Sequence, residues 1–360
     1  MSEQVSFVDR AKDVRPGEEL DVEKVAAYLR GIDASLVGTP VVTQFPGGAS
    51  NLTYLLAYPS GRELVLRRPP FGHRAKSAHD MLREARVMKA LKPVYSYVPN
   101  VVAVCDDASV LDADFFVMDR IRGIIPRTNL PKGMTLSPQD TRVLCRNVLD
   151  RMIELHKVDY AAAGLSNLGK GEGYVARQIS GWSDRYRKAR TENVGDFEPV
   201  MAWLAAKMPA GEVAITIVHN DFRFDNVVLD EHDPMRVIGV LDWEMATLGD
   251  PLMDLGNSLA YWVEPGDDSF RQLTRRQPTH LPGMFSRAEV VEYYGQQTGM
   301  RVDNFDFYEV YGLFRLAVII QQIYYRFHHG QTKNPEFGTY YALTQWLEKH
   351  CLGLIERSKL

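Results

Sequence analysis

The most restrictive feature of this sequence is the stretch VHNDFRFDNVVLD at residues 218–230, which lies between apolar runs. It carries a histidine, an arginine and several carboxylate or amide side chains, whereas a connecting turn needs only about two to five polar residues. After the turn-like segment EHDPM, a second apolar run, RVIGVLD, ends at Asp242. The pattern predicts an antiparallel hairpin whose open end carries polar side chains.

The hairpin is expected to bring three oxygen-bearing side chains together. With its turn centred near Asp233, Asn226 would lie opposite about Val240, so that Asp242 lies beside Asn226. Asp221 precedes this pair on a non-helical loop. Magnesium prefers hard oxygen ligands and usually keeps substrate phosphates as others, which leaves one carboxylate to accept a proton from a hydroxyl nucleophile. The alternative is that these residues only cap turns, as single Asp and Asn side chains often do.

Length and composition limit the class of protein. A chain of 360 residues is long enough for two packed units. The net charge of −4 argues against a nucleic-acid partner, which usually requires a basic surface. No apolar run has the length of a membrane span, and the start of the chain lacks the apolar core of a signal peptide. The chain has three cysteines, which lie far apart: Cys105, Cys145 and Cys351. Their spacing and odd number indicate buried thiols and a cytoplasmic protein.

The order of patterns predicts a sheet-rich small lobe followed by a helical large lobe. Residues 1–36 form a polar extension with a helix near 22–29. Residues 37–120 hold short strand-like runs and one helix, and residues 121–360 are mostly helical apart from the hairpin. Within the second part, Ser137 and the proline after it are typical of a helix start. Residues 264–285, rich in proline and glycine, are expected to be a loop insertion.

Two features of the small lobe suit a phosphate-binding role. In FPGGASNLTYL, a glycine-containing turn between strands can offer backbone N–H groups to phosphate oxygens, with Ser50 and Asn51 as further donors. A plain hairpin loop is the alternative for this turn. In ELVLRRPP, strand alternation places Val65 and Arg67 on one face and the following Leu and Arg68 on the other. One arginine is expected to face the nucleotide, and the other to be solvated.

The helix expected at 75–91 supplies an independent clue. Its apolar arc at helical spacing contains the carboxylate of Glu84. A buried carboxylate needs a partner, because an unpaired buried charge is costly. A cation on the neighbouring strand would serve, although Glu84 could instead lie at the margin of the arc and bend toward water.

Together these parts resemble the aminoglycoside phosphotransferase family, a branch of the protein-kinase-like fold. VHNDFRFDN is similar to the family's His-Gly-Asp-x-x-x-x-Asn loop, with Asn220 in place of the usual glycine. VLDWEMA is similar to its Ile-Asp-Trp-Glu segment, and GDPLMDLG to the Asp-Pro-x-x-Asp-Leu that follows. The resemblance covers about residues 37–345. It implies a bilobal α+β fold with a small antiparallel sheet lobe, and it implies ATP and Mg²⁺ as cofactors.

The resemblance also implies roles by position. Asp221 would be the catalytic base, and Asn226 and Asp242 the metal ligands. Arg67 and Glu84 would take the places of the family's strand lysine and its helix partner. The nucleotide would meet the hinge formed by Met118, Asp119 and Arg120. Arginine for lysine at position 67 is not a neutral exchange, because its planar fork binds phosphate differently, and Asn220 restricts the backbone beside the base. Candidate supporting residues are His219, Arg223, Glu244 and Asp254.

The acceptor is the part of the function on which the sequence says least. The runs LVLRRPP and VMDRIRG resemble the subgroup of the kinase-like domain of acyl-CoA dehydrogenases 10 and 11, which implies a hydroxyacyl compound. From Tyr311 to Leu360 there are six Lys or Arg against three Asp or Glu, so this segment shows no acidic patch for a polycationic aminoglycoside. Arg315 and Arg326, eleven apart on one expected helix face, are candidate acceptor-binding residues.

Two other functions remain open on the sequence alone. One is a true aminoglycoside phosphotransferase. The other is a nucleotide-binding pseudokinase that serves as an interaction module, against which the presence of all three oxygen-bearing residues argues. The expected partner is a small molecule with a hydroxyl group, neither nucleic acid nor membrane, and the sequence leaves the oligomeric state undecided.

Overall fold

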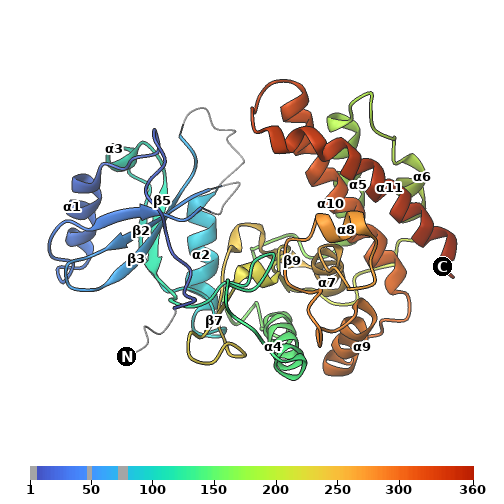
Figure 1. Cartoon of the computed structure of the whole chain (residues 1–360), viewed down its shortest axis with the longest axis horizontal. Helices are drawn as coiled ribbons and strands as arrows, with labels where there is room; N and C mark the ends of the chain where they lie inside the picture. Colours follow the sequence, from blue (N-terminus) through green and yellow to red (C-terminus); the bar gives the residue numbers. More distant parts are fainter. Residues whose placement is uncertain (1–5, 47–50, 72–79) are drawn as a thin grey trace. The chain divides into compact units, whose positions relative to one another are not determined.

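The computed structural model describes residues 6–46, 51–71 and 80–360 and divides the chain into two compact units (Figure 1). The first unit consists of Met1–Thr135, Ala161–Leu165 and Phe224–Ala246. The second unit consists of Leu136–Tyr160, Ser166–Arg223 and Thr247–Leu360. The fold is of the bilobal protein-kinase-like α+β class, as the resemblance implies.

The first unit is built on a five-stranded antiparallel sheet with the order β1-β2-β3-β5-β4. Its strands fall where the short apolar runs predict them: β1 Val41–Gln44, β2 Leu52–Ala57, β3 Glu63–Arg68, β4 Val101–Cys105 and β5 Phe115–Asp119. One face of this sheet packs against α1 (Val22–Ile32) and the short α3 (Ala108–Leu111). Leu64 and Leu66 belong to that core, so strand alternation turns Val65 and Arg67 to the other face.

Helix α2 (Met81–Leu91) packs against β4 and β5. It begins after Asp80, whose side chain accepts a hydrogen bond from the backbone N–H of Arg83. The predicted start of this helix, residues 75–79, lies outside the described residues. The predicted apolar arc is confirmed where it is described, and Glu84 is buried within it at 1% exposure.

The predicted hairpin is present in the first unit as β7 (Val227–Leu229) and β8 (Val237–Val240). The boundary expected at residue 120 would assign the hairpin to the helical part of the chain, but the structure assigns it to the first unit. Val240 donates its N–H to the carbonyl of Tyr97 at 2.9 Å, and Ile124 forms a two-way bridge with Leu229. These backbone bonds fasten the hairpin to segments of the first unit, which no local pattern in the sequence could indicate.

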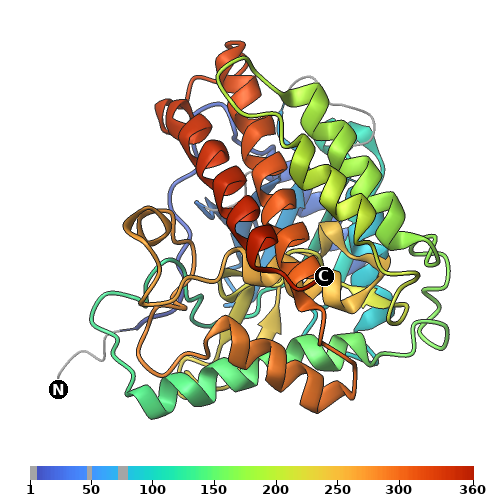
Figure 2. The ribbon, with the colours of Figure 1, turned by 90° about the vertical axis from the view of Figure 1, so that its right-hand side faces the viewer.

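The second unit consists mainly of helices. They are α4 Pro138–His156, α5 Tyr174–Ala189, α6 Glu198–Ala206, α7 Pro251–Ala260, α8 Ser269–Leu273, α9 Arg287–Thr298, α10 Phe305–His328 and α11 Tyr340–Arg357. Helix α4 starts as predicted, with the Ser137 side chain accepting from the N–H of Asp140. Figure 2 shows α10 and α11 side by side, in agreement with their contacts. A small two-stranded sheet joins β6 (Thr216–Val218) to β9 (Thr247–Gly249).

Helices α7 and α10 cross closely because each has a glycine at the crossing. A Cβ atom on Gly312 would meet the carbonyl oxygen of Gly256, and one on Gly256 would meet the carbonyl of Tyr308. We expect Gly312→Ala to lower the free energy of unfolding by about 1–3 kcal/mol, because rigid backbone would have to move apart. Urea unfolding measures this. The control is Gly181→Ala in α5, where a Cβ meets no atom within 4 Å; an equal loss there would contradict the explanation.

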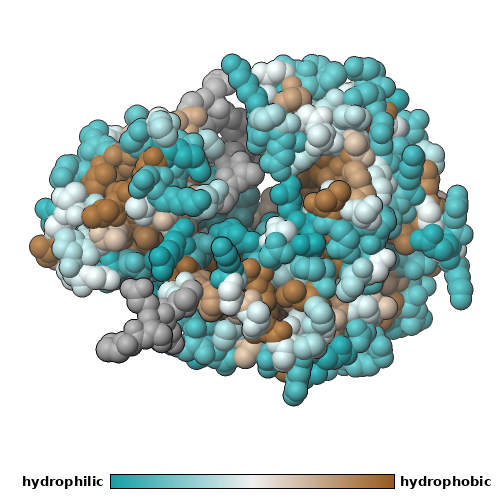
Figure 3. Space-filling model, in the orientation of Figure 1, coloured by the Kyte–Doolittle hydropathy of each residue, from teal (hydrophilic) through white to brown (hydrophobic). Residues whose placement is uncertain are grey.

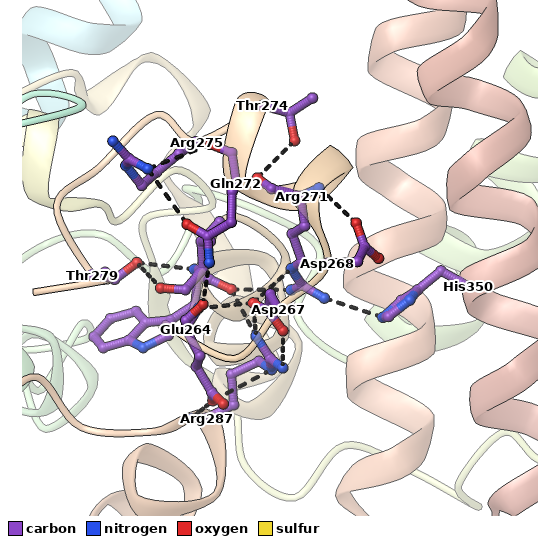
Figure 4. A network of polar contacts seen from close by, with 12 residues as sticks. Glu264, Asp267, Asp268, Arg271, Gln272, Thr274, Arg275, Thr279, Arg287 and His350 are labelled. Atoms are coloured by element: carbon purple, nitrogen blue, oxygen red, sulfur yellow. Dashed lines mark hydrogen bonds and ion pairs between the residues drawn. The ribbon is translucent and has the colours of Figure 1, made fainter.

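The stretch expected to be a loop insertion, residues 264–285, contains the short helix α8 and is held by a polar network (Figure 4). Asp267 accepts two hydrogen bonds from Arg287, both at 2.8 Å, and Arg271 contacts His350 at 3.1 Å. Burial, together with the charges of Arg271 and Arg287, lowers the pKa of His350 to about 4. The imidazole is therefore neutral near pH 7 and accepts a hydrogen bond from Arg271 through Nε2.

The three cysteines are buried free thiols, as predicted. Polar side chains make up much of the surface visible in Figure 3, with apolar residues in separate patches. Among the described residues, no helix has the length and apolar character needed to cross a membrane.

Candidate active site

A pocket of about 160 Å³ lies within the first unit. Its walls come from β3, from β5 with the segment after it, and from the open end of the hairpin. The residues that line it include Val65, Arg67, Met118, Asp119, Arg120, Asp225, Asn226 and Asp242. Predicted nucleotide-binding and metal-binding residues therefore share one concave site, although they are far apart in the sequence.

Arg67, which lines this pocket, forms the predicted ion pair with Glu84. The Arg67 Nη1 atom lies 3.0 Å from Glu84 Oε1, and both side chains are buried. Burial alone would lower the pKa of Arg67, but the carboxylates of Glu84, Asp242 and Glu244 outweigh it and raise that pKa, so the guanidinium stays charged. Burial raises the pKa of Glu84 above its usual range, and the charge of Arg67 opposes this rise.

Arg68 behaves differently from its prediction. It was expected to be solvated, yet it is 1% exposed. Its Nε atom donates to the carbonyl of Pro69 at 3.1 Å, and its guanidinium lies 3.7 Å from the centre of the Phe71 ring. The aromatic ring and the local carbonyl cover this arginine, and the strand register predicted for Arg67 is confirmed.

Asn226 and Asp242 meet at the open end of the hairpin, one residue away from the predicted register. Val227 lies opposite Val240, and Leu241 donates its N–H to the carbonyl of Asn226 at 2.8 Å. Asp242 adopts a left-handed backbone conformation with φ of 68°. Its Oδ1 atom lies 3.1 Å from Arg67 Nη2. An amide oxygen and a carboxylate are thus placed together in the pocket, as hard oxygen donors for a divalent cation.

The donor set fits magnesium better than a cation held by protein alone. Among the described residues, no group of three or more His, Cys, Asp and Glu side chains could form a complete metal site. Magnesium usually takes one or two carboxylates and completes its shell with water and substrate phosphates. Asn226 and Asp242 would hold it in that manner.

The hinge residues line the pocket and are fixed by neighbouring groups. The Asp119 carboxylate accepts from Arg62 Nη2 at 3.1 Å and from Asn100 Nδ2 at 2.8 Å. Arg120 pairs with Glu63 at 2.9 Å. Met118 lies in β5, with 7% exposure. The charged side chains of Asp119 and Arg120 are thus held by neighbouring groups of the first unit.

Asn51 is the described part of the predicted glycine turn, since Ser50 and residues 47–49 lie outside the described residues. Its Nδ2 atom donates to Glu244 Oε2 at 2.6 Å. The Glu244 backbone is also held, because Arg83 donates to the carbonyls of Glu244 and Ala246 at 3.2 and 2.5 Å. Asn51 therefore binds a protein carboxylate, where the sequence suggested a ligand phosphate.

Asp221 lies in the second unit on a loop that is fastened by the buried Asp254. The Asp254 carboxylate accepts from the backbone N–H groups of His219 and Asn220, both at 2.7 Å, and contacts His156 Nε2 at 3.1 Å. Although burial opposes it, the hydrogen bond and charge of His156 help to hold the pKa of Asp254 below its usual range. An ionised carboxylate with these donors fixes the backbone directly before Asp221.

Asn220 explains how the loop tolerates a residue larger than glycine. Its φ is 66°, a left-handed conformation that asparagine accepts more readily than most residues. Its Oδ1 atom accepts from the Tyr174 hydroxyl at 3.0 Å and from Asn257 Nδ2 at 3.1 Å. Its carbonyl accepts from Arg315 Nη2 at 2.9 Å. These hydrogen bonds stabilise Asn220 in the left-handed backbone conformation that glycine would adopt without strain.

Comparison with known proteins decides the family. The model of the phosphotransferase enzyme family matches residues 41–290, well over half of the chain. The chain belongs to this family. The chain is similar to a candidate aminoglycoside phosphotransferase of Ralstonia eutropha, a crystal structure with 29% identity and a TM-score of 0.80, over 95% of this chain and 100% of that one. Choline kinase of Cryptosporidium parvum, with a TM-score of 0.62, 12% identity and coverage of 94% and 96%, shares the fold.

The curated relatives that the chain matches are longer proteins. Acyl-CoA dehydrogenase family member 10 of Mus musculus is 33% identical over 336 residues, which are 91% of this chain and 30% of the relative. Acyl-CoA dehydrogenase family member 11 of Homo sapiens is 30% identical over 353 residues, 96% of this chain and 44% of the relative. The chain thus spans less than half the length of either relative.

Arg223 and Arg315 support the loop around Asp221. Arg223 Nε lies 3.2 Å from Asp221 Oδ1, and its guanidinium lies over the ring of Tyr261. Arg315 was expected to face the acceptor, but it is 4% exposed and its Nη2 atom is engaged by the Asn220 carbonyl. Arg326, on the same helix, is exposed. Arg315 is therefore a buried support of the loop, and the acceptor-binding role predicted for it is wrong.

Several residues that support the site were not predicted from the sequence. Tyr174 on α5 and Asn257 on α7 contact the loop at Asn220, and His156 on α4 contacts Asp254, which fastens the loop. None of the three belongs to a local motif. Arg83, next to Glu84 on α2, donates to two carbonyls after Asp242 and was not among the predicted residues. One available signal was a polar residue at the helical spacing of apolar ones, as at His156, which lies four and three residues after Met152 and Ile153.

Proposed function

We propose that this phosphotransferase is a kinase that transfers the γ-phosphate of ATP to a hydroxyl group of a small molecule. The observation that carries the proposal is that Arg67, Asn226 and Asp242 line one pocket of the first unit, with Glu84 paired to Arg67. This arrangement places a fixed cation, which can bind phosphate, near oxygen donors that can bind Mg²⁺. Phosphoryl transfer uses both features. The anchored loop that presents Asp221 in the second unit adds a candidate base.

Each residue then has a part in the reaction. Arg67, held by Glu84, would bind the nucleotide phosphates in its charged form. Asn226 and Asp242 would hold Mg²⁺, which when bound neutralises charge on the phosphates. Asp221 would accept the proton of the acceptor hydroxyl, and Arg223 would orient its carboxylate. The backbone of residues 118–121 would meet the base of the nucleotide.

For the acceptor, we propose a hydroxyacyl compound, such as a hydroxy acid or its thioester. The names of the curated relatives point to acyl chemistry, since both are acyl-CoA dehydrogenase family members. Aminoglycosides are the second candidate, because the similar Ralstonia structure carries that description. The excess of Lys and Arg over Asp and Glu from Tyr311 to Leu360, six against three, favours the acyl compound over a polycation.

Removal of one proposed metal ligand tests the role of the pocket. We expect Asp242→Ala to lower the affinity for ADP in the presence of magnesium by about tenfold or more, because a ligand oxygen is lost. Metal-free ADP should bind with little change. Titration calorimetry with and without magnesium measures both affinities. Asp233→Ala, a change at the exposed turn of the same hairpin, is the matched control. If Asp242→Ala keeps the whole effect of magnesium, the metal assignment is wrong.

A further inference from the structure

Arg67 contacts more acidic groups than one ion pair requires. Its Nη1 atom lies 3.0 Å from Glu84 Oε1, and its Nη2 atom lies 3.1 Å from Asp242 Oδ1 and 3.8 Å from Glu244 Oε2. The guanidinium side chain is only 10% exposed. Three carboxylates thus surround one buried cation, with Glu84 on one nitrogen and the other two competing for the second.

The planar fork of arginine is suited to this arrangement. Two nitrogens at a fixed spacing can bind carboxylates on different elements at once, whereas the ammonium of lysine is a single point of charge. Here one nitrogen reaches α2 through Glu84, and the other reaches the segment after β8 through Asp242 and Glu244. Arginine at position 67, in place of the family's lysine, therefore has a third carboxylate, that of Glu244, within 3.8 Å of its Nη2 atom.

Glu244 is held in place independently of Arg67. Asn51, directly before β2 and 1% exposed, donates to its Oε2 atom at 2.6 Å. Arg83 donates to the Glu244 carbonyl at 3.2 Å. Its carboxylate is therefore fixed near Arg67 Nη2 while Asp242 occupies the nearer position.

We propose that Glu244 is a positioning residue that keeps the Arg67 guanidinium in place when Asp242 turns to the metal–nucleotide complex. The inference rests on the proposed function. When the Asp242 carboxylate serves as a metal ligand, Arg67 Nη2 loses its nearest acceptor in a buried site, which is costly unless another acceptor replaces it. Glu244 supplies that acceptor after a small shift, so that Arg67 stays directed at the phosphates. Without magnesium, Asp242 remains with Arg67 and Glu244 is not needed.

Titration calorimetry with ADP tests this inference. For Glu244→Gln, which keeps an oxygen for Asn51 and removes the charge, we expect the affinity for metal-free ADP to stay unchanged. The gain in affinity on adding magnesium should fall about tenfold, the size of one lost charge-assisted hydrogen bond. Glu231→Gln is the matched control, since Glu231 belongs to the same unit but pairs with Arg122, at 3.6 Å. The control should retain the full gain.

A second background separates action through Arg67 from direct contact with the metal. In Arg67→Lys, which preserves a partner for Glu84, adding Glu244→Gln should cause almost no further loss. Asn51→Ala, which frees the Glu244 carboxylate, should lower the magnesium-dependent gain with Arg67 intact. An unchanged gain in Glu244→Gln, or an equal loss in both Arg67 backgrounds, would overturn the inference. If the unaltered protein binds no ADP at all, the proposed function itself fails.

Discussion

Replacing Asp221 by asparagine is expected to lower kcat for phosphate transfer by about 10²–10⁴-fold, the usual contribution of a general base. The amide keeps the size of the side chain but cannot accept the proton of a hydroxyl group. The affinity for ADP with magnesium should hardly change, because Asp221 is not among the residues that line the pocket of the first unit. The measurements are steady-state kinetics and titration calorimetry on the same preparation.

The fold should survive this change. The Asp221 side chain is 22% exposed, and Arg223, its partner, also lies over the ring of Tyr261. Asp230→Asn, at the hairpin turn, removes the same charge and leaves an oxygen to accept from His232 N–H, so it should retain full activity. Full kcat in Asp221→Asn would contradict the assignment of the base.

Removal of the Asp254 carboxylate is expected to have the largest effect on stability. Asp254→Ala would leave the N–H groups of His219 and Asn220 buried without their acceptor, and it would leave His156 without its carboxylate. Breaking a buried network of this kind costs about 3–5 kcal/mol. We expect a lower midpoint in urea unfolding and loss of activity, since the loop before Asp221 is released. Asp303→Ala, where the side chain is 68% exposed, should behave like the unaltered protein.

The effect of Asp254 should also depend on pH. Its pKa in the folded protein is lowered, so its contribution to stability is complete above the unfolded value of about 3.9. This contribution is lost as the pH falls through the lower folded pKa. The difference in unfolding free energy between Asp254→Ala and the unaltered protein should therefore be full at neutral pH and shrink in acid. A difference that grows in acid would contradict the ionised state of this carboxylate.

Local pattern was sufficient for much of the first unit. Alternation along β3 placed Arg67 on the same face as Val65, and the apolar arc of α2 contained Glu84, so their pairing followed from two independent periodicities. The hairpin followed from two apolar runs around a polar turn. Its register was one residue off, because the irregularity between Val228 and Leu229 cannot be read from residue types.

What sequence could not supply were contacts over long separations. Arg315 lies 95 residues from the Asn220 carbonyl that it binds, so helical spacing alone suggested an open face that the structure buries. The hairpin joins the first unit through Tyr97 and Ile124, more than a hundred residues earlier. Asn220 in place of glycine looked like a restriction until its partners on α5 and α7 were visible. In each case, tertiary packing decided the role.

The most direct test of the proposed function is phosphorus NMR of the protein with ATP, magnesium and a hydroxyacyl thioester. We predict that the γ-phosphate signal of ATP is lost while a phosphate monoester signal of the acceptor and the signals of ADP appear together. The same mixture with Asp221→Asn should show almost no ester. A protein that binds ATP with magnesium yet forms no phosphate ester with hydroxyacyl thioesters, hydroxy acids or aminoglycosides would contradict the proposal that it is a small-molecule kinase.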